Sequence, residues 1–170
     1  MNQDKDAQRM MVVLYSYQEA INRADADAAA SLFLDGGRIV EEGVQYPSVR
    51  AVIDYDVGLQ THIRLSEPVI SGKRVSCLYF MRQALDRAVG YAGSTRRADF
   101  TFAQNRIATL EIYPLDCEEH ECTEDLLSPF FTWIKTYHPA EWAEVSNLNY
   151  EGGAMLATMV QAWQDSQLSS

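Results

Sequence analysis

The segment from Tyr17 to Val44 constrains the fold of this chain more than any other part of it. Its sequence, YQEAINRADADAAASLFLDGGRIVEEGV, reads as the end of one helix, a short break, a second helix, a glycine turn and a strand. Asp25 suits an N-cap for the second helix, and Gly36-Gly37 suits a stop after it. The strand expected over 38–42 carries one carboxylate, Glu41, among apolar residues.

Apolar residues recur at helical spacing on both sides of the strand over 38–42. Residues 7–24 carry one such stripe, and a third helix is expected to begin at Pro47-Ser48. Four strand-like runs then follow, at about 63–71, 73–84, 90–103 and 106–114. Three helices followed by a meander of antiparallel strands predict an α+β fold, in which a curved antiparallel sheet wraps around the helices. This domain is expected to cover residues 1–116.

After Pro114 the chain changes character, and we expect 117–170 to form an acidic loop and a helical extension that packs on the same domain. The loop contains Cys117, His120 and Cys122, which are side chains of the kinds that bind zinc. Their spacing matches no specific zinc pattern, so a solvated acidic loop is the favoured interpretation and no metal is expected. An amphipathic region around 130–142 and a last helix after Gly152-Gly153 follow.

The amino-acid composition limits the kinds of partner that this chain is expected to bind. Of the 170 residues, 47% are hydrophobic and 22% are charged, as in a globular protein, and the formal net charge is −10. An acidic surface repels nucleic acid and anionic membranes, so neither is expected as a partner. The N-terminus does not resemble a signal peptide and no apolar run reaches the length of a membrane span. Three cysteines, an odd number, fit a reducing compartment, and a cytoplasmic location is therefore expected.

Two groups of residues resemble the nuclear transport factor 2-like superfamily. The first is the run from Tyr17 to Phe33, and the second is Asp99-Phe100-Thr101-Phe102 leading to Arg106-Ile107-Ala108. The likeness spans roughly residues 7–114 and depends on the order and spacing of weak motifs. It implies a cone-shaped barrel around three N-terminal helices. Within the superfamily, the chain looks most like the ketosteroid isomerases and the SnoaL-like polyketide cyclases.

This resemblance implies a candidate site. Tyr17 sits where the isomerases hold their oxyanion tyrosine, and Glu41 where they hold the carboxylate that moves a proton. Their third position, a protonated aspartate, falls on Ala98 if Phe100 and Phe102 set the strand register, which departs from the isomerase pattern. A shift of one residue would place Asp99 there and turn both phenylalanines to the other face.

His62 is the third candidate catalytic residue, because it lies between the third helix and the first long strand, where a side chain can enter the mouth of the cone. Scytalone dehydratase, of the same superfamily, uses histidines and tyrosines to eliminate water. Structural alternatives stay open for each candidate: Glu41 pointing outward, Tyr17 packed in the core and His62 on the surface.

Arg97 and Asp99 share one face of a strand, and Arg82 is expected on the neighbouring strand. These residues either resemble the Asp-Arg-Asp set of the epoxide hydrolases of the same superfamily or form a cross-strand ion pair on the outer face.

Two classes of function follow. The first is a cofactor-independent isomerase, cyclase or dehydratase that acts by general acid/base catalysis on a small apolar carbonyl or hydroxyl compound held in the cone. The alternative is a non-catalytic ligand-binding or dimeric assembly protein of the same fold, whose mouth Phe130, Phe131 and Trp133 could cover or fill. The resemblance also implies a homodimer through the outer face of the sheet.

Overall fold

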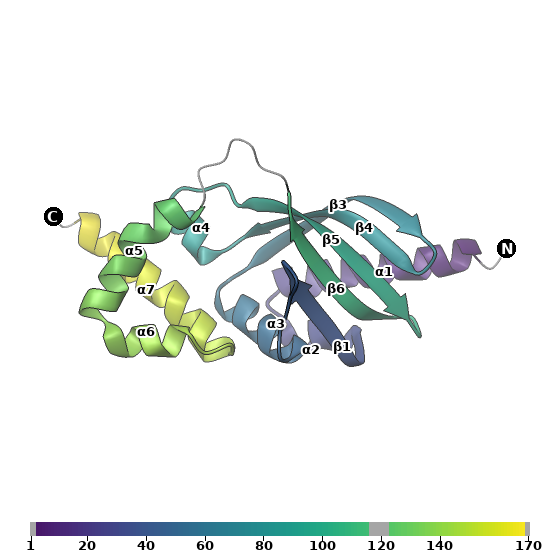
Figure 1. Cartoon of the computed structure of the whole chain (residues 1–170), viewed down its shortest axis with the longest axis horizontal. Helices are drawn as coiled ribbons and strands as arrows, with labels where there is room; N and C mark the ends of the chain where they lie inside the picture. The colour runs from purple at the N-terminus through teal and green to yellow at the C-terminus, as the bar shows by residue number, and fades with distance from the viewer. Residues whose placement is uncertain (1–2, 116–122, 169–170) are drawn as a thin grey trace.

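The computed structural model of the chain describes residues 3–115 and 123–168. The helices in this part are α1 (Gln3–Asn22), α2 (Ala26–Ser31), α3 (Val49–Gly58), α4 (Ala84–Ala88), α5 (Thr123–Tyr137), α6 (Pro139–Val145) and α7 (Tyr150–Leu168). The strands are β1 (Phe33–Glu41), β2 (Val44–Gln45), β3 (His62–Ser71), β4 (Arg74–Arg82), β5 (Ser94–Ala103) and β6 (Arg106–Pro114). Helices α4 to α7 gather at the end of the molecule opposite the N-terminus (Figure 1).

The described strands form one curled sheet in the order β2-β1-β6-β5-β4-β3. Strands β3 to β6 form the expected antiparallel meander, whereas β1 pairs with β6 in parallel. The sheet has two free edges, at β2 and β3, and is therefore not closed into a barrel. The α+β class and the curved sheet with helices against it are confirmed.

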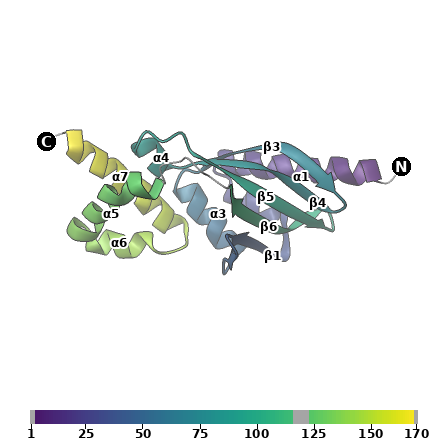
Figure 2. The same ribbon diagram turned by 45° about the horizontal axis from the view of Figure 1, so that its top comes forward.

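Helix α1 lies along the sheet beside β3 in both views (Figures 1 and 2). Its apolar stripe is buried as the spacing predicts, at Met10, Leu14, Tyr17 and Ile21. The end of the helix also covers the free edge of β3: the Asn22 amide donates to the Ile63 carbonyl at 2.9 Å and accepts from the Ile63 N–H at 2.8 Å. An edge strand whose backbone groups are paired in this way is protected from joining another sheet.

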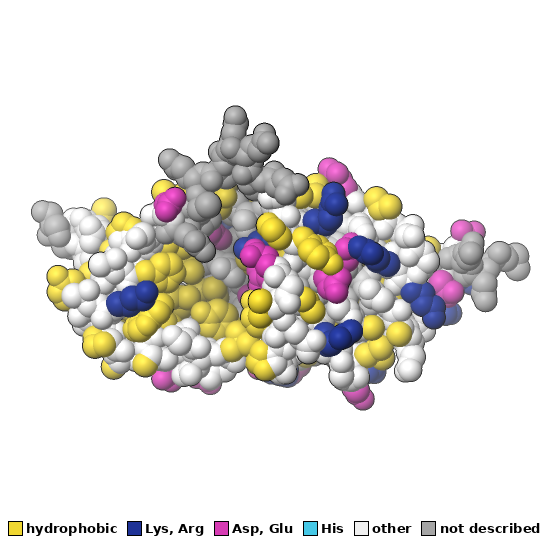
Figure 3. Space-filling view, in the orientation of Figure 1, with side chains coloured by type: hydrophobic (Ala, Val, Ile, Leu, Met, Phe, Trp, Pro, Cys, Tyr) yellow, Lys and Arg dark blue, Asp and Glu magenta, His cyan; other side chains and the backbone are white. Residues whose placement is uncertain are grey.

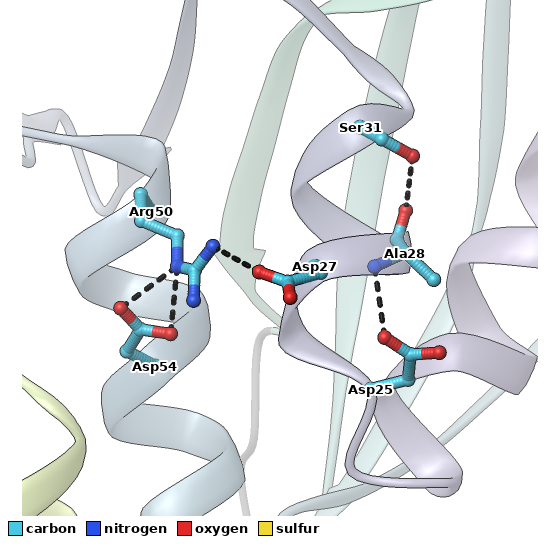
Figure 4. Close-up of polar contacts among 6 residues, drawn as sticks. All are labelled: Asp25, Asp27, Ala28, Ser31, Arg50 and Asp54. Atoms are coloured by element: carbon cyan, nitrogen blue, oxygen red, sulfur yellow. Dashed lines mark hydrogen bonds and ion pairs between the residues drawn. The ribbon is translucent and has the colours of Figure 1, made fainter.

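Helices α2 and α3 are joined by charged side chains on the surface (Figure 4). Asp25 caps α2 by accepting from the Ala28 N–H at 2.9 Å, as expected. The Arg50 guanidinium binds both Asp54 on its own helix, at 2.8 Å, and Asp27 on α2, at 2.5 Å. These groups lie at the surface, so their contribution to stability is small.

The start of β1 corrects one expectation. The second helix was expected to run as far as a stop at Gly36-Gly37, but α2 ends at Ser31 and β1 runs through both glycines. Phe33 pairs with Ile107 of β6 and is buried, so strand pairing outweighs the local helical pattern. The register shifts between Phe33 and Arg38, and the glycines accommodate this bulge.

The C-terminal helices form a second apolar core, which includes Phe130, Ile134 and Leu156. Helix α7 begins at Tyr150, so the glycine pair expected before the last helix lies inside it. A Cβ on Gly153 would overlap the Tyr55 carbonyl oxygen of α3, and this close backbone approach explains the glycine. Helix α7 thus packs directly on α3.

Among the described helices, none has the length and apolar character required to cross a membrane.

Candidate functional site

A cavity of about 300 Å³ lies between α3, the ends of β1, β4 and β5, and the C-terminal helices. Its walls are largely aliphatic, and Figure 3 shows a hollow with hydrophobic side chains between the C-terminal helices and the sheet. Seven polar or aromatic-hydroxyl side chains also line it: Glu41, Tyr46, Tyr55, Asp56, Tyr79, Gln83 and Arg96. A mostly apolar cavity with a few converging polar groups is the usual form of a small-molecule site.

Glu41, at the end of β1, lines this cavity and does not point away from it. Its carboxylate accepts a hydrogen bond of 2.6 Å from the Tyr46 hydroxyl and forms an ion pair with Arg96 of β5. Burial, and then the bond to Glu41, raise the pKa of Tyr46 above its ordinary value. Glu41 is thus held by a cation and a hydroxyl donor, which restrict the position of its carboxylate.

Asp56 of α3 is the second carboxyl in the cavity, and its surroundings differ from those of Glu41. Burial, and then the charge of Glu41, raise the pKa of Asp56 to about 7, while a hydrogen bond from Thr61 opposes the shift. The Thr61 hydroxyl donates to Asp56 Oδ1 at 3.3 Å. In the described part of the chain, no lysine or arginine forms an ion pair with Asp56.

Two tyrosines connect the core to the cavity. Tyr17 is buried, with its ring edge-on to Phe33 and Phe100 at centroid distances of 5.8 and 6.0 Å. Its hydroxyl lies beside that of Tyr79, and Tyr79 lines the cavity. Burial raises the pKa of both tyrosines, so both keep their protons at neutral pH. Tyr17 therefore supports the hydroxyl that faces the cavity and does not line the cavity itself.

The structure does not bring His62 to this site. His62 lies at the start of β3 on the exposed face, opposite in direction to the buried Ile63, and pairs in register with Arg82. It is not among the residues that line the cavity with Glu41 and Asp56. A catalytic role for His62 stays an untested prediction.

The register expected for β5 is confirmed, because Ala98, Phe100 and Phe102 are all buried against the helices. Asp99 is on the opposite face, where it forms an ion pair with Arg74 and accepts a hydrogen bond from Ser76. A cross-strand ion pair of Asp99 is therefore present on the outer face, but its cation is Arg74 of β4 and not Arg97 or Arg82 as expected. The isomerase aspartate thus has no counterpart on this strand inside the cavity.

No group of three potential metal ligands occurs among the described histidine, cysteine, aspartate and glutamate residues. The candidate zinc ligands Cys117, His120 and Cys122 lie outside the described residues.

Sequence reasoning missed three members of this site: Asp56, Tyr46 and Arg96. A signal for Asp56 is present, because it stands three and four residues after Ile53 and Val52 on the apolar stripe of α3. Charged residues seldom occupy such a stripe without a functional or structural reason. Tyr46 and Arg96 carry no comparable signal, since their partner Glu41 is reached only through strand pairing.

Together these groups can move a proton and stabilise developing negative charge. Two carboxyls in one cavity are placed in different surroundings, one ion-paired and one not, which is how acid/base roles are commonly divided. The protonated hydroxyl of Tyr79 is a hydrogen-bond donor suited to an oxyanion, whereas the Tyr46 hydroxyl already donates its proton to Glu41.

No protein-family model and no curated protein sequence matches this chain. Several solved structures, however, are similar to it in fold. The epoxide hydrolase/cyclase-like enzyme SalBIII, reported with a role in pyran ring formation in the polyether salinomycin, has a TM-score of 0.56 at 18% identity, covering 64% of this chain and 92% of its own. An NTF2-like protein of unknown function from Cytophaga hutchinsonii has a TM-score of 0.53 at 10% identity, covering 61% and 88%.

A third similar structure is a putative ketosteroid isomerase from Kribbella flavida, with a TM-score of 0.52 at 9% identity, covering 71% of this chain and 87% of its own. These identities are too low to carry an activity across, and one scaffold supports many unrelated functions. The open curled sheet, the helices against it and these similarities together show that the chain has the nuclear transport factor 2-like fold.

Proposed function

We propose that this chain binds a compact apolar molecule with a carbonyl or hydroxyl group and moves a proton on it, with Asp56 as the general base. The reaction would be an isomerisation, cyclisation or dehydration. The observation that supports this proposal most is the pair of carboxyls: Asp56 has a pKa raised to about 7 and no cation partner among the described residues, while Glu41 is bound by Arg96. A general base works best when its pKa is close to the working pH.

Hydroxyl groups supply the second requirement of such a reaction. Tyr79 lines the cavity and its ring is buried beside Tyr17, so its hydroxyl has little freedom to move before a ligand arrives. A donor fixed in this way stabilises an oxyanion without the cost of reorganising at the moment of reaction. Proton transfer between such groups requires no cofactor. Glu41, the carboxylate expected to act as the base, has in this proposal the role of raising the pKa of Asp56.

The size of the cavity limits the ligand. An apolar protein cavity of about 150 Å³ accepts benzene. A cavity of about 300 Å³ is therefore suited to a molecule of one or two rings.

An assembly function of the same chain has an observation of its own. A groove on the outer face of the sheet is lined by Arg97, Asp99 and the exposed side chains of Val69 and Tyr113. Exposed apolar groups beside charged ones are typical of an interface. We therefore keep a homodimer through this face as part of the proposal, together with a cytoplasmic location. Sedimentation analysis tests whether the chain is a dimer.

A ligand screen tests the proposed function. Thermal shifts are measured with phenol, 2-naphthol and matching cyclic ketones on the wild type, Asp56→Asn and Asp54→Asn. Asp54 is the control, because it lies two residues away on the outer side of α3, bound to Arg50. We expect stabilisation of the wild type and the control, and an altered shift for Asp56→Asn. Equal shifts in all three proteins would remove Asp56 from the site, and turnover of hits is assayed next.

A further inference from the structure

We propose that the turn between α6 and α7 forms part of the ligand site, and that Leu148 on this turn sets the largest ligand the cavity accepts. This inference rests on the proposed function, since it assumes that the cavity holds a small molecule. It assigns a specificity role to a segment outside the curled sheet and its three N-terminal helices.

Leucines from the C-terminal helices close one wall of the cavity. Leu148 and Leu156 both line it, together with Leu59 and Leu85 from the region that follows α3 and β4. Leu156 belongs to the second apolar core and is buried, so changing it would disturb packing. Leu148 is half-buried on a turn, so its side chain contributes to the cavity wall and little to that core.

The turn that carries Leu148 is held in one conformation by its neighbours. The Asn149 side chain accepts from the Gly152 N–H at 2.8 Å and so caps α7, while the Asn147 N–H donates to the Glu144 carbonyl at 3.0 Å. A side chain on a turn held in this way has little freedom to move, so a ligand must fit the space that the side chain leaves.

Helix α3 ties this wall to the polar groups of the site. The Tyr55 hydroxyl donates to the Val145 carbonyl at the end of α6, at 3.3 Å. Gly153 of α7 packs against the Tyr55 backbone, next to Asp56 in the chain. The distance between Leu148 and the Asp56 carboxyl is thus fixed by backbone packing, which makes Leu148 a limit on the length of a ligand whose polar group reaches Asp56.

The test uses phenol, 2-naphthol and 2-hydroxyanthracene, which carry the same hydroxyl on one, two and three rings. Dissociation constants are measured by calorimetry for the wild type, Leu148→Ala and Leu148→Trp. Leu168→Ala is the control, because Leu168 is 87% exposed at the end of α7. Circular dichroism and thermal melting establish that each variant is folded.

We expect the wild type and the control to bind phenol and 2-naphthol and to exclude the three-ring compound. Leu148→Ala should improve binding of 2-hydroxyanthracene relative to 2-naphthol by at least about tenfold, the effect of a small change in pocket volume. Leu148→Trp should keep phenol and lose 2-naphthol; if it does not fold, the alanine variant alone decides.

Two results would overturn the inference. One of them leaves the proposed function standing, and the other contradicts it as well. If the wild type binds these compounds and Leu148→Ala leaves their relative affinities unchanged, Leu148 does not set the size limit, and the proposed function stands. If none of the compounds binds the wild type, the ligand class of the proposed function fails together with the inference.

Discussion

Asp56 and Glu41 lie in one cavity, and burial, followed by the charge of Glu41, raises the pKa of Asp56. The two carboxyls come from different elements, α3 and β1, and only Glu41 has an arginine beside it within the described chain. Two carboxyl groups in one cavity cannot both be ionised without an energetic cost, because their negative charges repel each other. The group without a cation therefore holds its proton to higher pH, and this difference is the basis of the proposed division of roles.

Replacing Asp56 by Asn should lower turnover of any substrate that the screen identifies by about 10²–10⁴-fold, the usual contribution of a general base. The amide keeps the size of the side chain and cannot accept a proton. Asp54→Asn on the same helix should retain turnover within about twofold of the wild type, because it changes only a surface pair with Arg50. Steady-state kinetics of both variants measure the effect, and equal rates would contradict the role of Asp56.

Activity should depend on pH through the same group. A base must be unprotonated to act, so kcat/KM should rise with pH through about 7, the raised pKa of Asp56. In Glu41→Gln one cause of that shift is removed, and the midpoint of the profile should move to lower pH. A profile that loses its midpoint altogether in Glu41→Gln would instead identify Glu41 as the base.

Stability should show the opposite trend with pH. The unfolded chain loses the Asp56 proton near its ordinary pKa of 3.8, while the folded chain keeps it to about 7. Between these values the folded state binds more protons, so the free energy of unfolding falls as pH rises, by at most about 1.4 kcal/mol per pH unit. Urea unfolding of the wild type and Asp56→Asn isolates this contribution, which should be absent from the variant. Parallel pH curves for the two proteins would refute it.

Much of the scaffold was predictable because it is encoded locally. The stripe of α1, the Asp25 cap and the strand over 106–114 each depend on residues close together in the sequence, and all three are present in the structure. The bounds of β1 were not predictable in this way, because Phe33 leaves the helical pattern to pair with Ile107, a residue far along the chain.

The site was predictable only in part, for the same reason. Glu41 was identified as a site residue and lines the cavity, whereas its partner Arg96 comes from a strand more than fifty residues later. Asp56 was predictable as an unusual residue from its place on an apolar stripe. Its proposed role as a base depends in part on the charge of Glu41 nearby, which only the structure reveals. Leu148 gives no sequence signal, since its role depends on how α7 packs against α3.

The ion pair at the polar side of the cavity should contribute to stability as a coupled unit. Arg96→Met leaves Glu41 without its cation in a partly buried position and should lower the free energy of unfolding by about 1–2 kcal/mol, less than a fully buried pair would. Adding Glu41→Gln should recover part of this loss, because no unpaired charge is then left. A double-mutant cycle by chemical denaturation measures the coupling, and additive losses would show that the two side chains act independently.

The glycine contact between α7 and α3 should be intolerant of any side chain. Gly153→Ala places a methyl group where the Tyr55 carbonyl lies, and we expect a loss of about 1–3 kcal/mol in the free energy of unfolding, the cost of overpacking. Thr158→Ala, on the exposed side of the same helix, is the control and should change it by less than about 0.5 kcal/mol. A neutral Gly153→Ala would mean that the two helices are not in backbone contact.

The proposed role of Asp56 is tested most directly by titrating its carboxyl, followed by carbon-13 NMR and assigned by the loss of its signal in Asp56→Asn. We expect a midpoint near pH 7 in the wild type and a lower one in Glu41→Gln. A midpoint near about 4, the ordinary value for an aspartate, or one that does not respond to Glu41, would contradict it.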